Sequence, residues 1–139
     1  MSLTYQEARD EIFALFKVAW DTTGYPVHYQ DVRRGRDKDK EPWAVVTLQH
    51  SSGFQATLSG VSGSRTFARL GFVTVQIFSP SGKGLQESYD LCKVVSDAFE
   101  GASTPGGVWF RNVRLNEVGR DGEFHQINVI AEFRYDEIK

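Results

Sequence analysis

The feature that most constrains the fold of this chain is an alternation of apolar and polar residues, with a period of two, near its C-terminus. From Ile127 to Tyr135 every second residue is apolar or aromatic. The residues that alternate with them are mostly polar or charged, and they include Gln126, Asn128, Glu132 and Arg134. Because successive side chains of a β-strand point to opposite faces, this pattern predicts a sheet with one covered face. The other face should meet water or another subunit.

Two amphipathic helices are available to cover that sheet. Thr4-Tyr5-Gln6-Glu7 has the pattern of a capping box, in which Thr4 and Glu7 exchange hydrogen bonds at a helix start. Apolar residues then recur at helical spacing until 21–24 and Pro26 end the helix. The first helix should bury Ala8, Ile12, Leu15, Phe16 and Ala19. A second helix, ending near Phe99, should bury an apolar side made of Leu85, Tyr89, Cys92, Val95 and Phe99, joined by Leu91, Val94 and Ala98.

Segments of strand character lie around these helices, at 27–32, 43–50, 54–58 and 67–78. Two long strands close the chain, beginning near Trp109 and His125, and Asp121-Gly122 marks the hairpin turn between them. The order helix, three or four strands, helix, two strands predicts the α+β class. We expect one domain over 1–139, with two helices packed on a mostly antiparallel sheet of about five to six strands.

Composition excludes several classes of function. The 139 residues carry a net charge of −2, so no basic excess drives binding to nucleic acid or to an anionic membrane. The apolar runs are too short to span a bilayer, and the N-terminus lacks the pattern of a signal peptide. The single cysteine, Cys92, rules out an internal disulfide and suits a reducing compartment. We expect no membrane partner and no sequence-specific nucleic acid.

Catalytic chemistry has no clear motif in this sequence. His28, His50 and His125 are isolated from one another at spacings that match no metal motif. Cys92 lies on the apolar side of its helix, where a core role is expected rather than a nucleophilic one. The segment 81–84 lacks the early glycine and the final Ser or Thr of a phosphate-binding loop. We therefore predict no catalytic residue, no cofactor and no metal, and no enzyme.

The aromatic content is higher than two thin layers need, at 13% of the chain. Phe72 and Phe78 share a strand face with Thr74 and Gln76, opposite the apolar face of Val73, Val75 and Ile77. Such side chains are enriched at subunit interfaces. The polar loops at 33–41 and 59–66 are candidate docking segments. The interface residues predicted from these features are Arg33, Arg34, Arg36, Arg65, Phe72 and Phe78.

Two segments carry a family resemblance. They are EPWAVVTL at 41–48, after the charged loop, and GFVTVQIFSPSGKG at 71–84, leading into the second helix. This arrangement resembles the tail terminator proteins of long-tailed bacteriophages, also called tail completion or minor tail protein U-like proteins. One such group is described as a phage-related domain of unknown function. The similarity in order and length covers nearly the whole chain.

The resemblance implies a structural virion protein without catalysis or cofactor. Such a protein forms a ring, hexameric in the family, that caps the tail tube, stops its polymerisation and joins tail to head. Its implied partners are other copies of itself, the tail tube protein and a head-completion or connector protein. The implied location is the virion tail, assembled in the cytoplasm of the host bacterium.

Two alternatives stand beside this interpretation. One is another ring subunit of the connection between head and tail. The other is a small α+β ligand-binding domain or enzyme with its site between helices and sheet. A concave pocket with convergent polar groups and perturbed pKa values would favour the ligand-binding domain or enzyme.

Overall fold

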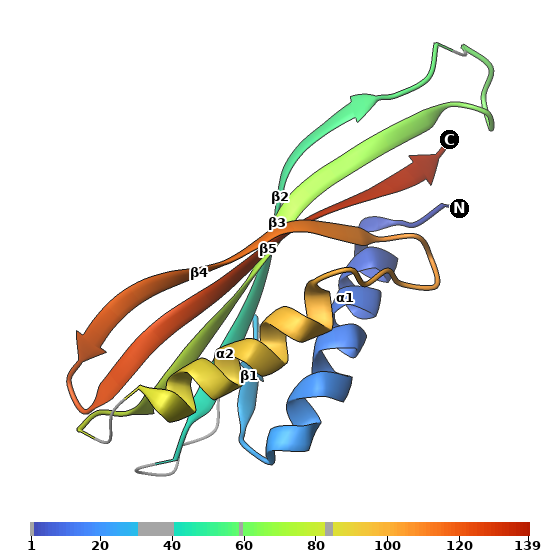
Figure 1. Cartoon of the computed structure of the whole chain (residues 1–139). Coiled ribbons are helices and arrows are strands. Elements are labelled where there is room, and N and C mark those ends of the chain that lie inside the picture. The colour runs from blue at the N-terminus through green and yellow to red at the C-terminus, as the bar shows by residue number, and fades with distance from the viewer. Residues whose placement is uncertain (1, 31–40, 59, 83–84) are drawn as a thin grey trace.

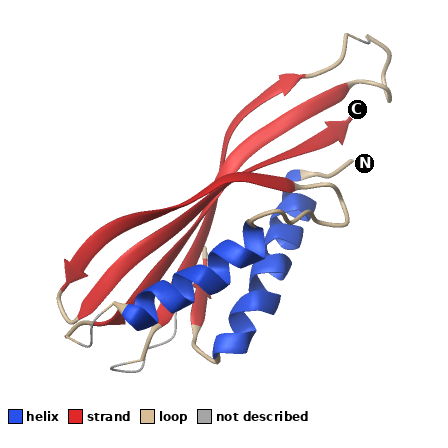
Figure 2. Ribbon diagram, viewed as in Figure 1, coloured by secondary structure: helices blue, strands red, loops and turns tan. Residues whose placement is uncertain are grey.

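The computed structural model describes residues 2–30, 41–58, 60–82 and 85–139, and it has two layers (Figure 1). The elements in chain order are α1 (Tyr5–Trp20), η1 (Asp21–Thr23), β1 (Val27–Tyr29), β2 (Trp43–Gln55), β3 (Thr66–Pro80), α2 (Gln86–Phe99), β4 (Trp109–Asp121) and β5 (Phe124–Ile138). Both helices lie on the same side of one twisted sheet (Figure 2). The predicted α+β class and its helix-on-sheet packing are confirmed.

The sheet has five described strands in the order β1-β2-β3-β5-β4. β1 pairs in parallel with β2, and the remaining pairs are antiparallel. The pairing of β3 with β5 is unbroken from Thr66 opposite Ile138 to Pro80 opposite Phe124. One end of β2, β3 and β5 extends past the helices (Figure 1). The sheet is therefore longer than the layer that covers it.

Two predicted strand boundaries were wrong. The segments 43–50 and 54–58 belong to one strand, because β2 continues through a bulge at Ser51. The hairpin turn falls at Gly122 and Glu123, one residue later than expected, and Gly122 has a φ of 63°. A second irregularity, between Glu117 and Gly119, shifts the register of β4 and moves the turn. The predicted strand at 27–32 is described only as far as residue 30, and its strand part is β1.

Helix α1 begins at the predicted capping box. The Glu7 amide donates to Thr4 Oγ1 at 3.2 Å, and the Thr4 amide donates to Glu7 Oε1 at 3.0 Å. These bonds pair two amide groups at the helix start that have no partner within the helix. The side facing the sheet consists of Ala8, Ile12, Phe16 and Trp20, all buried.

Helix α2 buries most of its predicted apolar side, and the prediction was wrong for two residues at its N-terminal end. Its buried side is centred on Leu91, Cys92, Val95 and Phe99, with Ser88 at its N-terminal end. Leu85 and Tyr89, expected in the core, are 39% and 42% exposed. Leu85 is the N-cap residue, and Tyr89 lies at the flank of the helix, where its hydroxyl donates to the Glu117 carboxylate of β4. The stripe of Leu91, Cys92, Val95 and Phe99 faces the core, and Leu85 and Tyr89 lie at its edge.

The core lies between the helices and the sheet. Eight residues lie on the apolar faces of their helices and strands, and all of them are buried: Ile12, Phe16, Val73, Val75, Val95, Phe99, Ile127 and Val129. Gly71 allows a close approach within this packing. A Cβ atom there would lie 2.3 Å from the Gln49 carbonyl oxygen and 2.6 Å from Cζ of Phe133. The ring of Phe133 therefore occupies the space that a side chain at 71 would need.

Candidate interaction surface

The sheet face opposite the helices, called here the outer face, carries the candidate surface. Figures 1 and 2 show both helices on the other side of the sheet. Phe72, Thr74, Gln76 and Phe78 of β3 point to the outer face and are half-buried, as their alternation predicts. Neighbouring strands cover them partly, and among the described residues no helix packs over them. The prediction of one covered and one uncovered face is confirmed.

Phe78 belongs to an aromatic cluster at one end of this face. Its ring stacks on Trp43 with centroids 4.2 Å apart and an interplanar angle of 13°. Phe124 meets the Trp43 ring edge-on at 6.3 Å. Trp43 is opposite Phe78 in the register of β2 and β3, so cross-strand packing explains the contact. Part of the aromatic surplus therefore stabilises the sheet itself.

Phe72 lies six residues away along β3, roughly 20 Å at the rise of a strand. It lines a cavity of about 250 Å³, called here the bulge pocket. Four neighbouring strands contribute to it: Ser51 from β2, Leu70, Gly71 and Phe72 from β3, Glu132 and Phe133 from β5, and Arg111 and Arg114 from β4. The pocket thus combines an apolar floor with charged walls.

Two bulges shape the pocket. In β2, Ser51 is the extra residue between His50 and Ser52. In β4, two residues, Asn112 and Val113, lie between the partners of Glu132 and Ile130, where β5 has one. Asn112 adopts a left-handed φ of 52°, which asparagine tolerates better than most residues. Bulges bend strands and redirect side chains, and they are frequent beside functional sites.

The bulge in β4 brings two arginines to one carboxylate. Residues three apart in a regular strand point to opposite faces, but Arg111 and Arg114 both lie beside Glu132. Arg114 Nη1 is 3.0 Å from Glu132 Oε2, and Arg111 Nε is 3.7 Å from Oε1. The Asn112 side-chain amide also donates to Glu132. This hydrogen bond, followed by the contribution of the arginines, lowers the pKa of Glu132.

The electrostatic result is a small basic site. Two guanidinium groups share one carboxylate, which leaves one positive charge in excess. Arg134 is directly opposite Trp109 on the same face, and its guanidinium lies 5.7 Å from the centroid of the Phe54 ring. Both Arg111 and Arg114 are about half exposed, at 53% and 44% of their side chains. Their outward N–H groups can donate to an incoming carboxylate.

Of the six residues predicted for the interface, the structure describes Arg65, Phe72 and Phe78, and these three lie in different places. Phe72 lies in the bulge pocket, and Phe78 lies in the aromatic cluster. Arg65 precedes β3 and fixes the C-terminus, because its amide and carbonyl pair with those of Lys139 at 3.1 and 2.8 Å. Arg33, Arg34 and Arg36 fall outside the described residues. Sequence reasoning missed Arg111 and Arg114, because strict alternation places them on opposite faces of β4.

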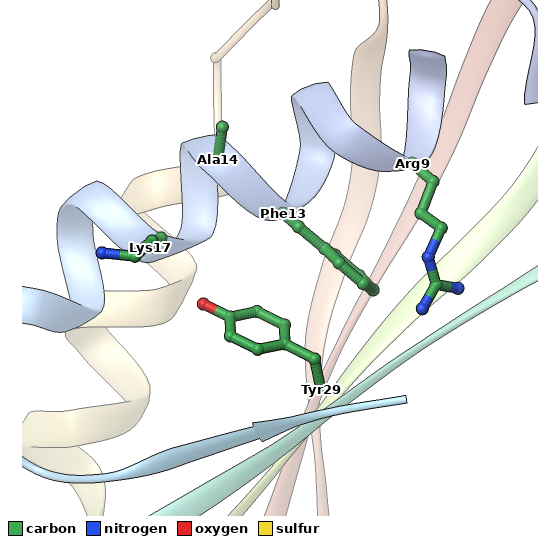
Figure 3. A pocket seen from close by; sticks show the side chains of 5 residues that line it. All are labelled: Arg9, Phe13, Ala14, Lys17 and Tyr29. Atoms are coloured by element: carbon green, nitrogen blue, oxygen red, sulfur yellow. The ribbon is translucent and has the colours of Figure 1, made fainter. Parts of the chain in front are cut away.

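A second groove lies between α1 and β1 and has a volume of about 290 Å³ (Figure 3). Phe13 and Tyr29 form its apolar part, with ring centroids 5.2 Å apart. Its basic groups already have partners within the chain. Arg9 donates to the Gln30 carbonyl oxygen at 2.9 Å, and Lys17 pairs with Asp21 at 2.9 Å. A ligand site between helix and sheet would need such groups to converge on open space, and here they do not.

His50 and Cys92 both pack inside the molecule. His50 Nε2 lies 2.7 Å from the Tyr135 hydroxyl, and burial followed by the charge of Arg69 lowers the pKa of His50. Cys92 is buried, and this burial raises the pKa of its thiol to about 11, which suppresses the reactive thiolate. The predicted core role of Cys92 is confirmed.

The described residues contain no group of three or more His, Cys, Asp or Glu side chains placed to hold a metal ion. In the same part of the chain, no helix is both long and apolar enough to cross a membrane.

Comparison with known proteins identifies similar folds. No protein-family model matches the sequence, and no curated protein matches it either. Among solved structures, a chain whose description states no function aligns with a TM-score of 0.64 and 14% identity, covering 91% of this chain and 94% of the other. A chain of the "Virion of native gene transfer agent (GTA) particle" aligns with a TM-score of 0.58 and 17% identity, covering 96% of this chain and 99% of the other. The fold described here is therefore also the fold of a chain in a virion particle.

Proposed function

We propose that this chain is a structural protein of a phage-like virion. The observation that carries the proposal is the similarity in fold to a chain of the gene transfer agent virion, over nearly the full length of both. The sequence resemblance to phage tail terminators in 41–48 and 71–84 supports it independently. The described chemistry agrees with a binding role, because the bulge pocket combines charged and apolar side chains that can bind a partner.

Within such a virion, the specific role we propose is that of a tail terminator. The chain would form a ring, hexameric as in the family it resembles, at the end of the tail tube. There it would stop polymerisation and bind a head-completion or connector protein. A closed ring uses a heterologous interface, in which two different surfaces of each subunit meet. The outer face and the helix layer are two such surfaces on opposite sides of this chain.

Length control follows from the physics of such a ring. Tube subunits add to an open end until a protein occupies that end without offering a site for the next subunit. Because a ring binds through all its subunits together, weak contacts per subunit give a stable cap through their effective concentration. The chain itself needs no catalytic step for this activity.

The proposal is tested by deleting the gene from the phage or prophage that carries it. Electron microscopy should then show tails of variable and excessive length that are not joined to heads, and plasmid-borne wild-type protein should restore normal virions. Normal virions from the deletion strain would contradict the proposal. Tubes of normal length without heads would indicate instead another ring subunit of the head–tail connection.

Reversing Arg33, Arg34 and Arg36 together to glutamate tests the charged loop within the same system. The segment 33–41 to which they belong contains no apolar side chain to bury, so the fold should be retained. Free tails of full length would place the loop on the head side, and overlong tubes would place it on the tube side. Normal virions from this variant would remove the loop from both interfaces.

A further inference from the structure

We infer that the bulge pocket binds the acidic side of helix α2 from a second copy of this chain. The inference rests on the proposed ring function for the presence of a neighbouring copy. In the contact that we infer, the helix layer of one copy lies on the outer face of the next.

The pocket has the chemistry of a carboxylate receptor. Arg111 and Arg114 share a single internal carboxylate, Glu132, so their donor capacity is not exhausted. Leu70 and Phe72 form an apolar floor beside them, on which the methylene groups of an incoming acidic side chain can pack. The bulge in β4 holds both guanidinium groups on the same side, so their arrangement exists before a partner arrives.

Helix α2 offers the complementary charge. Its solvent-exposed side, extended to the residue after its C-terminus, carries four carboxylates and one ammonium group, a net charge of −3. These groups belong to Glu87, Asp90, Lys93, Asp97 and Glu100. Asp90 and Asp97 are seven residues apart and therefore lie on one side of the helix. Lys93 forms its ion pair with Asp97 at 3.0 Å, and this exposed pair contributes little to stability.

The topology prevents the two surfaces from meeting within one copy. α2 packs on the helix-covered face of the sheet, whereas Arg111 and Arg114 lie on the outer face. A twofold dimer through the outer face would place one basic pocket against another, which like charges disfavour. Stacking helix layer on outer face brings opposite charges together instead. Because this contact joins different surfaces, it generates a ring when its rotation closes.

The test uses charge reversals on each side of the contact in the full chain. The pocket variant is Arg111→Glu with Arg114→Glu, and the helix variant is Asp90→Lys with Asp97→Lys. A matched control is Arg120→Glu on the same strand, where the guanidinium bonds the Gly122 carbonyl oxygen of the turn. Circular dichroism melts verify that each variant folds. Sedimentation velocity and negative-stain microscopy then measure self-association, alone and with tail tube protein.

We expect each reversal to weaken self-association roughly tenfold or more, since like charges would then face each other across the contact. The control should associate as the wild type does. Mixing the two variants should restore association, because every contact in an alternating ring then joins opposite charges. Higher salt should weaken the wild-type assembly, as for other exposed ion pairs.

The outcomes separate this inference from the proposed function. If both variants fold and still form the rings that the wild type forms, the inference is overturned and the ring function is left intact. Association that depends on these charges, without any effect on tube length, would support the inference and contradict termination. A pocket variant that still forms rings but no longer binds tube protein would assign the pocket to that partner and overturn the inference. A wild type that is monomeric with and without tube protein would overturn both.

Discussion

The two faces of the sheet differ in how regularly their side chains alternate. The helix-covered face is regular: Val73, Val75, Ile77, Ile127 and Val129 alternate without interruption and are all buried. The outer face is irregular around the bulge pocket, where Ser51 and the pair Asn112–Val113 each interrupt a ladder. Packing against helices demands continuity, because every residue must fill a defined space. A face that binds another molecule can instead use irregularity to aim a few side chains.

The largest expected difference between the faces is in their contribution to stability. Phe99→Ala removes a fully buried ring that packs on Phe110, with centroids 5.0 Å apart, and should cost roughly 3–5 kcal/mol of unfolding free energy. Phe72→Ala on the outer face should cost about 1 kcal/mol, because its ring is only half-buried. Urea unfolding of both variants gives the two values. Equal losses would mean that the outer face is as much a core as the inner one.

How far the sequence predicts these faces depends on regularity. The alternation in β3 and β5 predicts which side chains are covered, because a strand has a fixed period of two. The capping box predicts the start of α1, because both of its hydrogen bonds are local. The bulge at Asn112 has no comparable local signal, since one asparagine in a polar strand does not determine its own φ. Arg111 and Arg114 were therefore missed, although both are visible in the sequence as charged residues.

The same argument explains the errors in α2 and at the last turn. Helical spacing alone permits Tyr89 in the core, but contacts with both the sheet and α1 select the side containing Leu91 and Cys92. The turn lies at Gly122 because of a bulge at Val118, four residues earlier in β4. Long-range pairing decides each of these features, so local patterns alone cannot resolve them.

A smaller loss of stability is expected from a substitution at Gly71, where β3 lies close to the ring of Phe133. Gly71→Ala introduces a Cβ atom 2.6 Å from Cζ of Phe133 and 2.3 Å from a backbone oxygen, so strand or ring must shift. The expected loss is about 1–3 kcal/mol, as for other overpacked sites. Gly60→Ala is the matched control, because no atom lies within 4 Å of its added Cβ. Thermal melts should show a clear loss for the first variant only, and a stable Gly71→Ala would refute the described packing.

A further prediction concerns the backbone of the bulge in β4. Asn112→Val places a β-branched residue at a φ of 52°, which should cost about 1–2 kcal/mol in addition to the loss of the hydrogen bond to Glu132. Asn112→Gly accepts that φ but loses the hydrogen bond to Glu132, so its cost should be about 1 kcal/mol. Both values come from urea unfolding. If valine were tolerated as well as glycine, the bulge would not have the left-handed conformation that positions Arg114.

The smallest expected effect is a pH dependence on the helix-covered face. Burial, followed by the positive charge of Arg69, lowers the pKa of His50 in the folded chain below its ordinary value. The unfolded chain therefore binds this proton at a higher pH than the folded chain does. Stability from the neutral imidazole is complete above the unfolded pKa of about 6.5 and declines as the pH falls toward the folded pKa. His50→Gln removes this titration, so the difference in unfolding free energy between wild type and variant should shrink from pH 7.5 to pH 5. A difference that grows on acidification would mean that the folded chain favours protonated His50 and would contradict the packing described around Tyr135.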